Sequence, residues 1–182
     1  MMINLSELRS LKKSFLFAIR GLIYCIKNER NMRIHIVVAA NVILFSIFFD
    51  LTRIEYALLF LIIGLVLLCE TINTAIEALV NLGAPSYHSL ARIAKDVAAG
   101  AVLLVSVISV AVAIVLFGHP NKLFDTLIKI VNNPMLFLLF LLLIGGGIVF
   151  IFKGFKLNLT KKTKKTEEVK IYKTKKKSNF KF

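Results

Sequence analysis

Two acidic side chains and one amide stand inside an otherwise apolar run of this chain, LIIGLVLLCETINTAIEALVNL. They are Glu70, Asn73 and Glu77, and at about 100° per residue they fall on one face of a helix, together with Thr74 and Asn81. If the run crosses a membrane, each carboxylate costs about 2.5–3.5 kcal/mol even on the lenient insertion scales. Two of them on one face therefore predict chemistry that neutralises or uses their charge.

The composition indicates that the whole chain is built around membrane spans. Hydrophobic residues make up 58% of its 182 residues, which exceeds the share in an ordinary soluble domain. They gather in four runs, and a spanning helix needs about 20 apolar residues. The runs predict an all-α membrane protein with spans at 34–49, 54–82, 97–117 and 134–152.

The distribution of Lys and Arg predicts how these spans are oriented. Nearly every basic residue lies on one side, in the segments 1–33, 83–96 and 153–182. The other side keeps only Arg53, Lys122 and Lys129. The positive-inside rule then places both termini in the cytoplasm. Glu77 is expected near the cytoplasmic end of its helix, and Glu70 about two turns deeper.

The segment 1–33 has the pattern of a helix that lies along the membrane surface. Leu, Ile and Phe recur at helical spacing, while Lys and Arg occupy the other faces. A helix packed against the bundle is the alternative, and one helix can do both. The segment leads into KNERNMRIH, where Glu29 stands among basic residues. A lone acid in a basic patch is usually a salt-bridge partner.

Three motifs occur in order along the chain. They are ERNMRIH, E-x-x-N-T-A-I-E-A-x-V from Glu70 to Val80, and H-x-x-A-x-x-A-K-D-x-A-A-G-A-V from His88 to Val102. Together they resemble the prokaryotic integral-membrane diacylglycerol kinase family, which includes the undecaprenol kinases of Gram-positive bacteria. The resemblance covers residues 10–117. It implies a homotrimer with shared active sites, in which each subunit has three spans and a surface helix.

The resemblance also implies the reaction, transfer of the γ-phosphate of MgATP to a membrane lipid alcohol. The family has no Walker motif, and this chain has no G-x-x-x-x-G-K-[ST]. Carboxylates, Mg²⁺ and a few basic groups must then supply the chemistry.

The carboxylates are expected to divide this work. Glu29 and Glu77, near the cytoplasmic surface, are hard oxygen ligands for Mg²⁺, which proteins hold through one or two carboxylates plus the nucleotide phosphates. Glu70, in deeper apolar surroundings, is expected to be the catalytic base for the lipid hydroxyl. Asn73 is expected to orient Glu70, Glu77 or a phosphate oxygen of the nucleotide, with a hydrogen bond between helices as the alternative.

Further residues are expected to bind the nucleotide. Lys95 opens the third span, where it can meet a β- or γ-phosphate, and Asp96 can hold Lys95 or a nucleotide hydroxyl. An ion pair that caps the helix is the alternative for these two residues. Ser86, Tyr87 and His88 match the nucleotide-facing segment of the family, although by sequence alone His88 is a loop histidine.

The chain departs from the family pattern in two places. Asn81 stands where the family commonly carries an aspartate, so a third carboxylate of the stripe is neutral here. Members usually stop after three spans, whereas this chain continues. The predicted parts are a surface helix at 1–33, a three-helix kinase core at 34–120, an outer loop at 121–133, an additional span at 134–152 and a Lys-rich cytoplasmic tail at 153–182.

The tail holds twelve Lys and two Glu, about ten of the fourteen net positive charges. Such a tail either anchors the topology or attracts anionic lipid headgroups. It lacks a recognisable fold for specific nucleic-acid binding.

These observations predict an ATP- and Mg²⁺-dependent lipid kinase of the bacterial plasma membrane. The elements ERN-x-x-x-H and N-T-A-I-E resemble the Gram-positive members more, which favours undecaprenol, converted to undecaprenyl phosphate, over diacylglycerol, converted to phosphatidic acid. A small proton- or ion-handling membrane protein, using the stripe as a relay, is the alternative from another class.

Overall fold

The computed structural model describes residues 5–83 and 89–153, and within these ranges all regular secondary structure is α-helical. Ser86, Tyr87, His88 and nearly all of the Lys-rich tail lie outside the described residues. The described helices that are long and apolar enough to cross a membrane are α2 (Arg30–Phe48), α3 (Arg53–Gly83), α4 (Ser89–Phe117) and α6 (Pro134–Lys153). The predicted all-α membrane architecture is confirmed.

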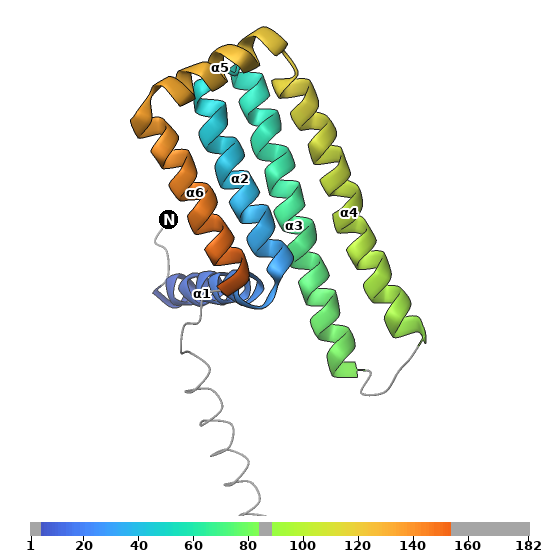
Figure 1. The fold of residues 1–182 in the computed structure, drawn as a ribbon. Helices are drawn as coiled ribbons and strands as arrows, with labels where there is room; N and C mark the ends of the chain where they lie inside the picture. Colours follow the sequence, from blue (N-terminus) through green and yellow to red (C-terminus); the bar gives the residue numbers. More distant parts are fainter. Residues whose placement is uncertain (1–4, 84–88, 154–182) are drawn as a thin grey trace, which may run out of the picture.

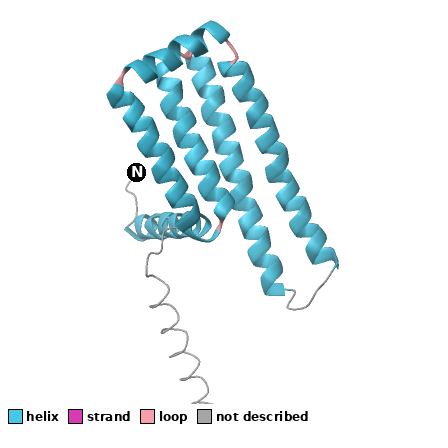
Figure 2. Ribbon diagram, in the orientation of Figure 1, coloured by secondary structure: helices cyan, strands magenta, loops and turns pink. Residues whose placement is uncertain are grey.

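The four long helices stand side by side in the order α6, α2, α3, α4 (Figure 1). Two helices run across the ends of this bundle: α1 (Leu5–Asn28) at the end where α2 begins, and α5 (Pro120–Asn132) at the opposite end (Figure 1). Short loops join the helices within the described ranges (Figure 2). In this bundle α2, α3 and α4 are consecutive neighbours, and α6 packs on the outer side of α2.

The surface helix ends earlier than the sequence predicted. The chain bends at Glu29, whose backbone is extended (φ −99°, ψ 119°) between α1 and α2. Residues 30–33 are consequently the first turn of a membrane-spanning helix rather than the end of the surface helix. Leu11 and Phe15 of α1 remain largely exposed on one face, as expected for a helix that offers its apolar face to a membrane, whereas Cys25 is buried against the bundle.

Side-chain caps fix the turn between α2 and α3. Thr52 and Glu55 form a capping box, in which the Thr52 N–H donates to Glu55 Oε2 at 2.7 Å and the Glu55 N–H donates to Thr52 Oγ1 at 3.3 Å. Asp50 adopts a left-handed conformation (φ 51°), which aspartate tolerates better than most residues. The Tyr56 hydroxyl then donates to the carbonyl of buried Ser46 at 2.9 Å, which ties α3 to α2.

The segment 121–133, expected as an outer loop, is largely helical and forms α5. Pro120 occupies the start of this helix, where its missing N–H costs nothing. The Thr126 hydroxyl donates to the carbonyl of Phe48 at 3.3 Å, so α5 is attached to the end of α2. Asn133 caps the next helix, because its Oδ1 accepts from the N–H groups of Met135 and Leu136 at 3.1 and 3.2 Å.

Candidate active site

Glu70 is a buried carboxylate without a hydrogen-bond partner among the described residues. It is 1% exposed, and neither Oε1 nor Oε2 has a partner. The N–H of Met32, in the first turn of α2, faces this carboxylate but does not reach hydrogen-bond geometry. A buried charge left in this state is costly, so this carboxyl group either carries a proton or has a partner outside the described residues.

Asn73 lies between Glu70 and Glu77 along α3 and contacts Glu77. Its Nδ2 donates to Oε1 of Glu77 at 3.2 Å, so it orients Glu77, one of the partners that the sequence suggested. Its Oδ1 is buried and has no partner within the described ranges. Next to it, the Thr74 hydroxyl donates to the carbonyl of Glu70 at 2.9 Å and leaves the Glu70 carboxylate free.

Glu29 brings a third carboxylate to the same place. Burial raises the pKa of Glu29 above its ordinary value, the charge of Glu77 raises it further, and Arg33 opposes both. The charges of Glu29 and Glu77 also act on Glu70. The bend between α1 and α2 thus places Glu29 beside the polar stripe of its own chain, where mutual repulsion favours a bound cation.

The carboxylates of Glu29 and Glu77 fit a divalent cation such as Mg²⁺. In the part of the chain that the structure describes, no three His, Cys, Asp or Glu side chains form a complete metal site by themselves. Mg²⁺ needs only one or two carboxylates when nucleotide phosphates and water complete its octahedron. Glu29 and Glu77 supply such a pair, and Asn73 holds Glu77 in place.

Lys95 reaches the stripe one turn beyond Glu77. Its Nζ donates to Oδ1 of Asn81 at 2.7 Å, across the contact between α3 and α4. Asp96 lies near Arg92 instead, with 3.7 Å between Oδ2 and Nε, so the structure does not pair it with Lys95. A neutral group, the amide of Asn81, therefore holds Lys95 at this end of the stripe.

A cavity of about 250 Å³ opens beside the deep carboxylate. Residues of three helices line it: Asn31, Ile34 and His35 from α2, Glu70 and Asn73 from α3, and Ala99, Val102, Leu103 and Ser106 from α4. The Ser106 hydroxyl is a further buried group without a partner there. Sequence reasoning missed Ser106, although a serine in an apolar span is a signal of polar contacts.

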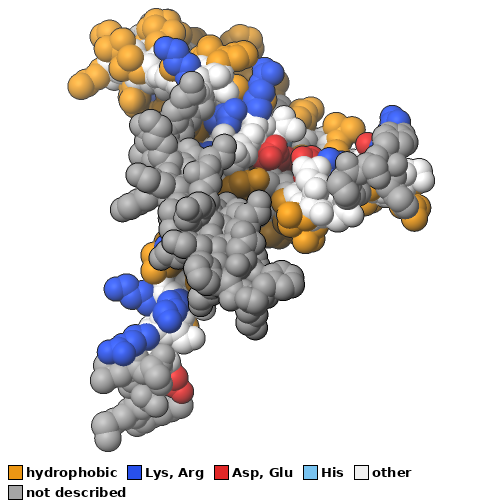
Figure 3. All heavy atoms as spheres, turned by 90° about the horizontal axis from the view of Figure 1, so that it is seen from below, with side chains coloured by type: hydrophobic (Ala, Val, Ile, Leu, Met, Phe, Trp, Pro, Cys, Tyr) orange, Lys and Arg blue, Asp and Glu red, His pale blue; other side chains and the backbone are white. Residues whose placement is uncertain are grey.

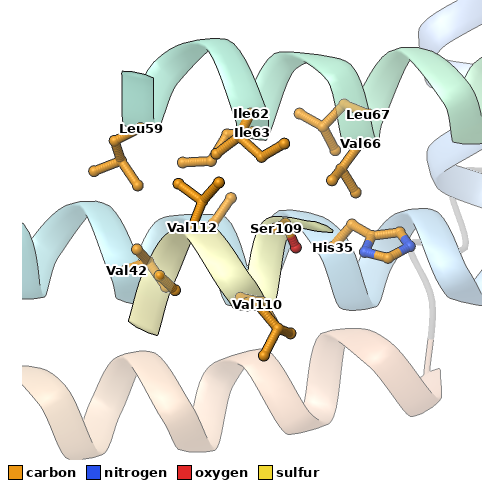
Figure 4. A pocket seen from close by; sticks show the side chains of 13 residues that line it. His35, Val42, Leu59, Ile62, Ile63, Val66, Leu67, Ser109, Val110 and Val112 are labelled. Atoms are coloured by element: carbon orange, nitrogen blue, oxygen red, sulfur yellow. The ribbon is translucent and has the colours of Figure 1, made fainter. Parts of the chain in front are cut away.

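A second, apolar cavity of about 140 Å³ lies farther along the same helices. His35 borders both cavities, and its imidazole lies at one end of a lining that is otherwise almost entirely carbon (Figure 4). Ser109 is the second polar side chain in Figure 4. The pair of cavities thus combines a polar part at Glu70 with an apolar part toward the middle of the bundle.

The end of the bundle near α1 carries charges of both signs. Seen from this end, acidic side chains lie near the centre with basic side chains beside them (Figure 3). Among these charges, Arg33 opposes the repulsion that Glu77 exerts on Glu29. This arrangement suits a polyanionic ligand accompanied by a cation.

Comparison of the sequence with known proteins places the chain in a family. The family model described as prokaryotic diacylglycerol kinase matches residues 16–117. The chain belongs to the prokaryotic diacylglycerol kinase family. The family resemblance seen in the sequence is confirmed, and the chain is a lipid kinase with membrane-spanning helices.

Curated relatives carry two names. Undecaprenol kinase of Bacillus subtilis (strain 168) is 39% identical over 112 residues, which cover 62% of this chain and 91% of that protein. Diacylglycerol kinase of Synechocystis sp. is 44% identical over 100 residues, 54% of this chain and 57% of that protein. Diacylglycerol kinase of Escherichia coli (strain K12) is 32% identical over 93 residues, 50% of this chain and 76% of that protein. No solved structure matches the chain significantly.

The family match decides between the two classes that the sequence left open, in favour of a kinase over an ion-handling protein. It includes Glu29, Glu70, Asn73, Glu77 and Lys95, and it ends at the last residue of α4. Helices α5 and α6 lie outside it.

Proposed function

We propose that this lipid kinase transfers the γ-phosphate of ATP to undecaprenol, with Mg²⁺ held by Glu29 and Glu77. The observation that carries the proposal is the state of Glu70. It is 1% exposed, has no partner among the described residues, and borders a cavity that shares His35 with an apolar cavity. A lipid alcohol needs this combination, because its hydroxyl must meet a base while its chain stays in an apolar environment.

In the proposed reaction the lipid oxygen attacks the γ-phosphorus in line with the bond to the β-phosphate. A new P–O bond to the lipid forms, the bond between the γ-phosphorus and the bridging oxygen breaks, and ADP leaves. Glu70 accepts the hydroxyl proton, a role that a carboxylate without internal partners can fill. Asn73 keeps Glu77 oriented, and its free Oδ1 can accept a hydrogen bond from the substrate.

When bound, Mg²⁺ would offset the charge of the phosphates and hold them in line. Lys95 would meet a β- or γ-phosphate from the end of the stripe, where Asn81 positions its ammonium group. Asp96, Ser86, Tyr87 and His88 remain proposed contacts of the nucleotide.

The test is phosphate transfer by purified Glu70→Gln protein in lipid. The variant should transfer labelled γ-phosphate to lipid alcohols about 10²–10⁴-fold more slowly than the unmodified protein. Asp125→Asn is the matched control, because Asp125 is an exposed carboxylate on α5, away from the stripe. Transfer by Glu70→Gln at the unmodified rate would remove the proposed base.

The choice of undecaprenol follows from the relative of Bacillus subtilis, which matches over 91% of its own length. Diacylglycerol is the second candidate, because the Synechocystis relative is 44% identical. A competition assay with both alcohols and labelled ATP separates them. A higher kcat/KM for diacylglycerol would reverse the assignment.

We also propose a homotrimer in the bacterial plasma membrane, with both termini cytoplasmic. The excess of Lys and Arg in 1–33, 83–96 and 153–182 supports this orientation, and the same tail charge favours contact with anionic headgroups. Protease protection in oriented vesicles tests the orientation, and mass measurement in detergent tests the trimer.

A further inference from the structure

We propose that Arg33 is a positioning residue for Glu29, and that α6, the span beyond the family match, supplies one of its anchors. This rests on the proposed function, since it takes Glu29 as a ligand of the divalent cation. In this proposal α6 helps to shape the kinase site instead of only packing beside it.

Arg33 is a buried cation whose hydrogen bonds go to the backbone. It is 9% exposed, and its Nη1 donates to the carbonyls of Ile26 and Lys27, both at 3.0 Å. Its Nε donates to the carbonyl of Ile151 at 3.2 Å. No carboxylate of the described residues lies within ion-pair distance of it. Its charge is held in place without being neutralised.

The three acceptors belong to the ends of two helices. Ile26 and Lys27 lie in the last turn of α1, and Ile151 lies in the last turn of α6. Carbonyls in a last turn lack partners within their helix, and a cation there is favoured by the helix dipole. Arg33 therefore joins the ends of α1 and α6 at the first turn of α2.

Glu29 lies in the bend that this junction holds. Its N–H donates to the carbonyl of Cys25 at 2.8 Å, and its extended backbone turns the chain from α1 into α2. Because Arg33 binds the carbonyls just before the bend from a position just after it, Arg33 fixes the angle at which Glu29 projects. The charged groups that act on Glu29 come from two helices: Arg33 on α2, and Glu77 and Glu70 on α3.

Helix α6 is packed on α2 one turn away from the junction. A Cβ added to Gly147 would lie 2.5 Å from Cγ1 of Val37, so the two helices touch there through a glycine. The Arg30 guanidinium also lies 4.9 Å from the centre of the Phe152 ring. A bulky side chain at position 147 must push α6 away from α2 and withdraw the Ile151 carbonyl from Arg33.

The experiment compares Gly147→Leu with Gly146→Leu in the full chain. A Cβ on Gly146 meets nothing within 4 Å, so this control adds the same side chain without moving α6. Binding of Mn²⁺, a spectroscopic probe of the Mg²⁺ site, is measured by electron paramagnetic resonance in lipid nanodiscs with a non-hydrolysable ATP analogue. Gly147→Leu should bind Mn²⁺ about tenfold more weakly, as expected when a group that orients a ligand is lost. Gly146→Leu should bind like the unmodified protein.

Two further changes separate positioning from general damage. Val37→Ala in the Gly147→Leu protein makes room for the leucine and should restore most of the Mn²⁺ affinity. Arg33→Lys keeps the charge and loses the planar donor fork, so it should bind Mn²⁺ better than Arg33→Gln and worse than the unmodified protein. The KM for the lipid alcohol should stay unchanged in each active variant.

Unchanged Mn²⁺ affinity in the Gly147→Leu and Arg33→Gln proteins would overturn the coupling. Should Gly147→Leu fail to fold, unchanged affinity in Arg33→Lys and Arg33→Gln would do the same. Glu29→Gln is measured in parallel. If Glu29→Gln binds Mn²⁺ normally, the metal role of Glu29 in the proposed function fails and takes the coupling with it. If only Glu29→Gln binds weakly, the coupling alone fails.

Discussion

Lys95 donates a hydrogen bond from Nζ to Oδ1 of Asn81 at 2.7 Å, which joins the start of α4 to the end of the polar stripe on α3. Asparagine positions the ammonium group without cancelling its charge. The full positive charge then remains available to a phosphate.

Asn81→Asp is expected to raise the KM for ATP, because an aspartate would compete with the phosphates for Lys95. The pair is exposed, and exposed ion pairs are worth about 0–1 kcal/mol, so the increase should be at most about fivefold. Steady-state kinetics at two salt concentrations provide the measurement, since screening should shrink the difference at high salt. A lower KM in Asn81→Asp would mean that Lys95 does not bind phosphate.

Glu70→Gln is expected to leave the protein at least as stable to heat while abolishing most activity. The unmodified carboxylate is buried without a partner, so an amide of the same shape removes a buried charge rather than a bond. Thermal unfolding in detergent, run beside the transfer assay, measures both effects. A large drop in Tm would indicate that Glu70 is part of the packing rather than of the chemistry.

Cation binding is expected to weaken in acid at a higher pH than an ordinary glutamate would cause. Burial and the Glu77 charge raise the pKa of Glu29 above 4.5, and a carboxylate must lose its proton before it binds a metal. Mn²⁺ affinity should rise as the pH rises through this raised pKa. Glu29→Gln should lose this part of the pH profile, and an unchanged profile would contradict the assignment.

The raised pKa of Glu29 has the opposite effect on the stability of the metal-free protein: this contribution falls as the pH rises. A raised pKa in the folded state means that the folded state binds the proton more tightly than the unfolded state. The stability contributed by protonated Glu29 is therefore present below about 4.5 and lost as the pH rises through the raised pKa. Thermal unfolding with and without Mg²⁺ across this range should show that the metal recovers stability on the alkaline side.

Mixed oligomers of Glu29→Gln and Glu70→Gln subunits are expected to stay inactive. Glu29 and Glu70 act on each other within one chain, so neither subunit type holds a complete set of carboxylates. Co-expression of two differently tagged chains, followed by tandem purification and the transfer assay, makes the test. Recovered activity would show that a neighbouring subunit supplies Glu29, in line with the shared active sites that the family resemblance implied.

The membrane spans and the stripe could be predicted because they depend on local periodicity. Each of these features depends on one helix alone: a span is an apolar run long enough to cross the membrane, and the stripe is a set of polar residues three and four positions apart. Glu70, Asn73 and Glu77 lie on one face of α3 as expected. The helix α5 was missed although Leu123, Leu127 and Ile130 carry helical spacing after a proline. This spacing indicates a helix, but a short segment between two spans fits a connecting loop equally well.

The bend at Glu29 and the contact of Arg33 with Ile151 could not be predicted in the same way. No glycine or proline marks the end of α1. Arg33 and Ile151 lie 118 positions apart, so their hydrogen bond depends on how α6 packs rather than on any local pattern. Tertiary contacts of this kind decide the shape of the site once the helices exist.

A helix lies across each end of the bundle, α1 at one and α5 at the other (Figure 1). Each is attached to α2, through the bonds of Arg33 to the end of α1 and through the bond of Thr126 to Phe48. With one such helix at each membrane surface, the subunit would have little freedom to move along the bilayer normal. A shift in either direction would pull one of the two helices out of the membrane interface. The two attached helices would then fix the depth of Glu70 in the membrane. A bilayer much thinner or thicker than the native one would strain the protein before it moved this carboxylate.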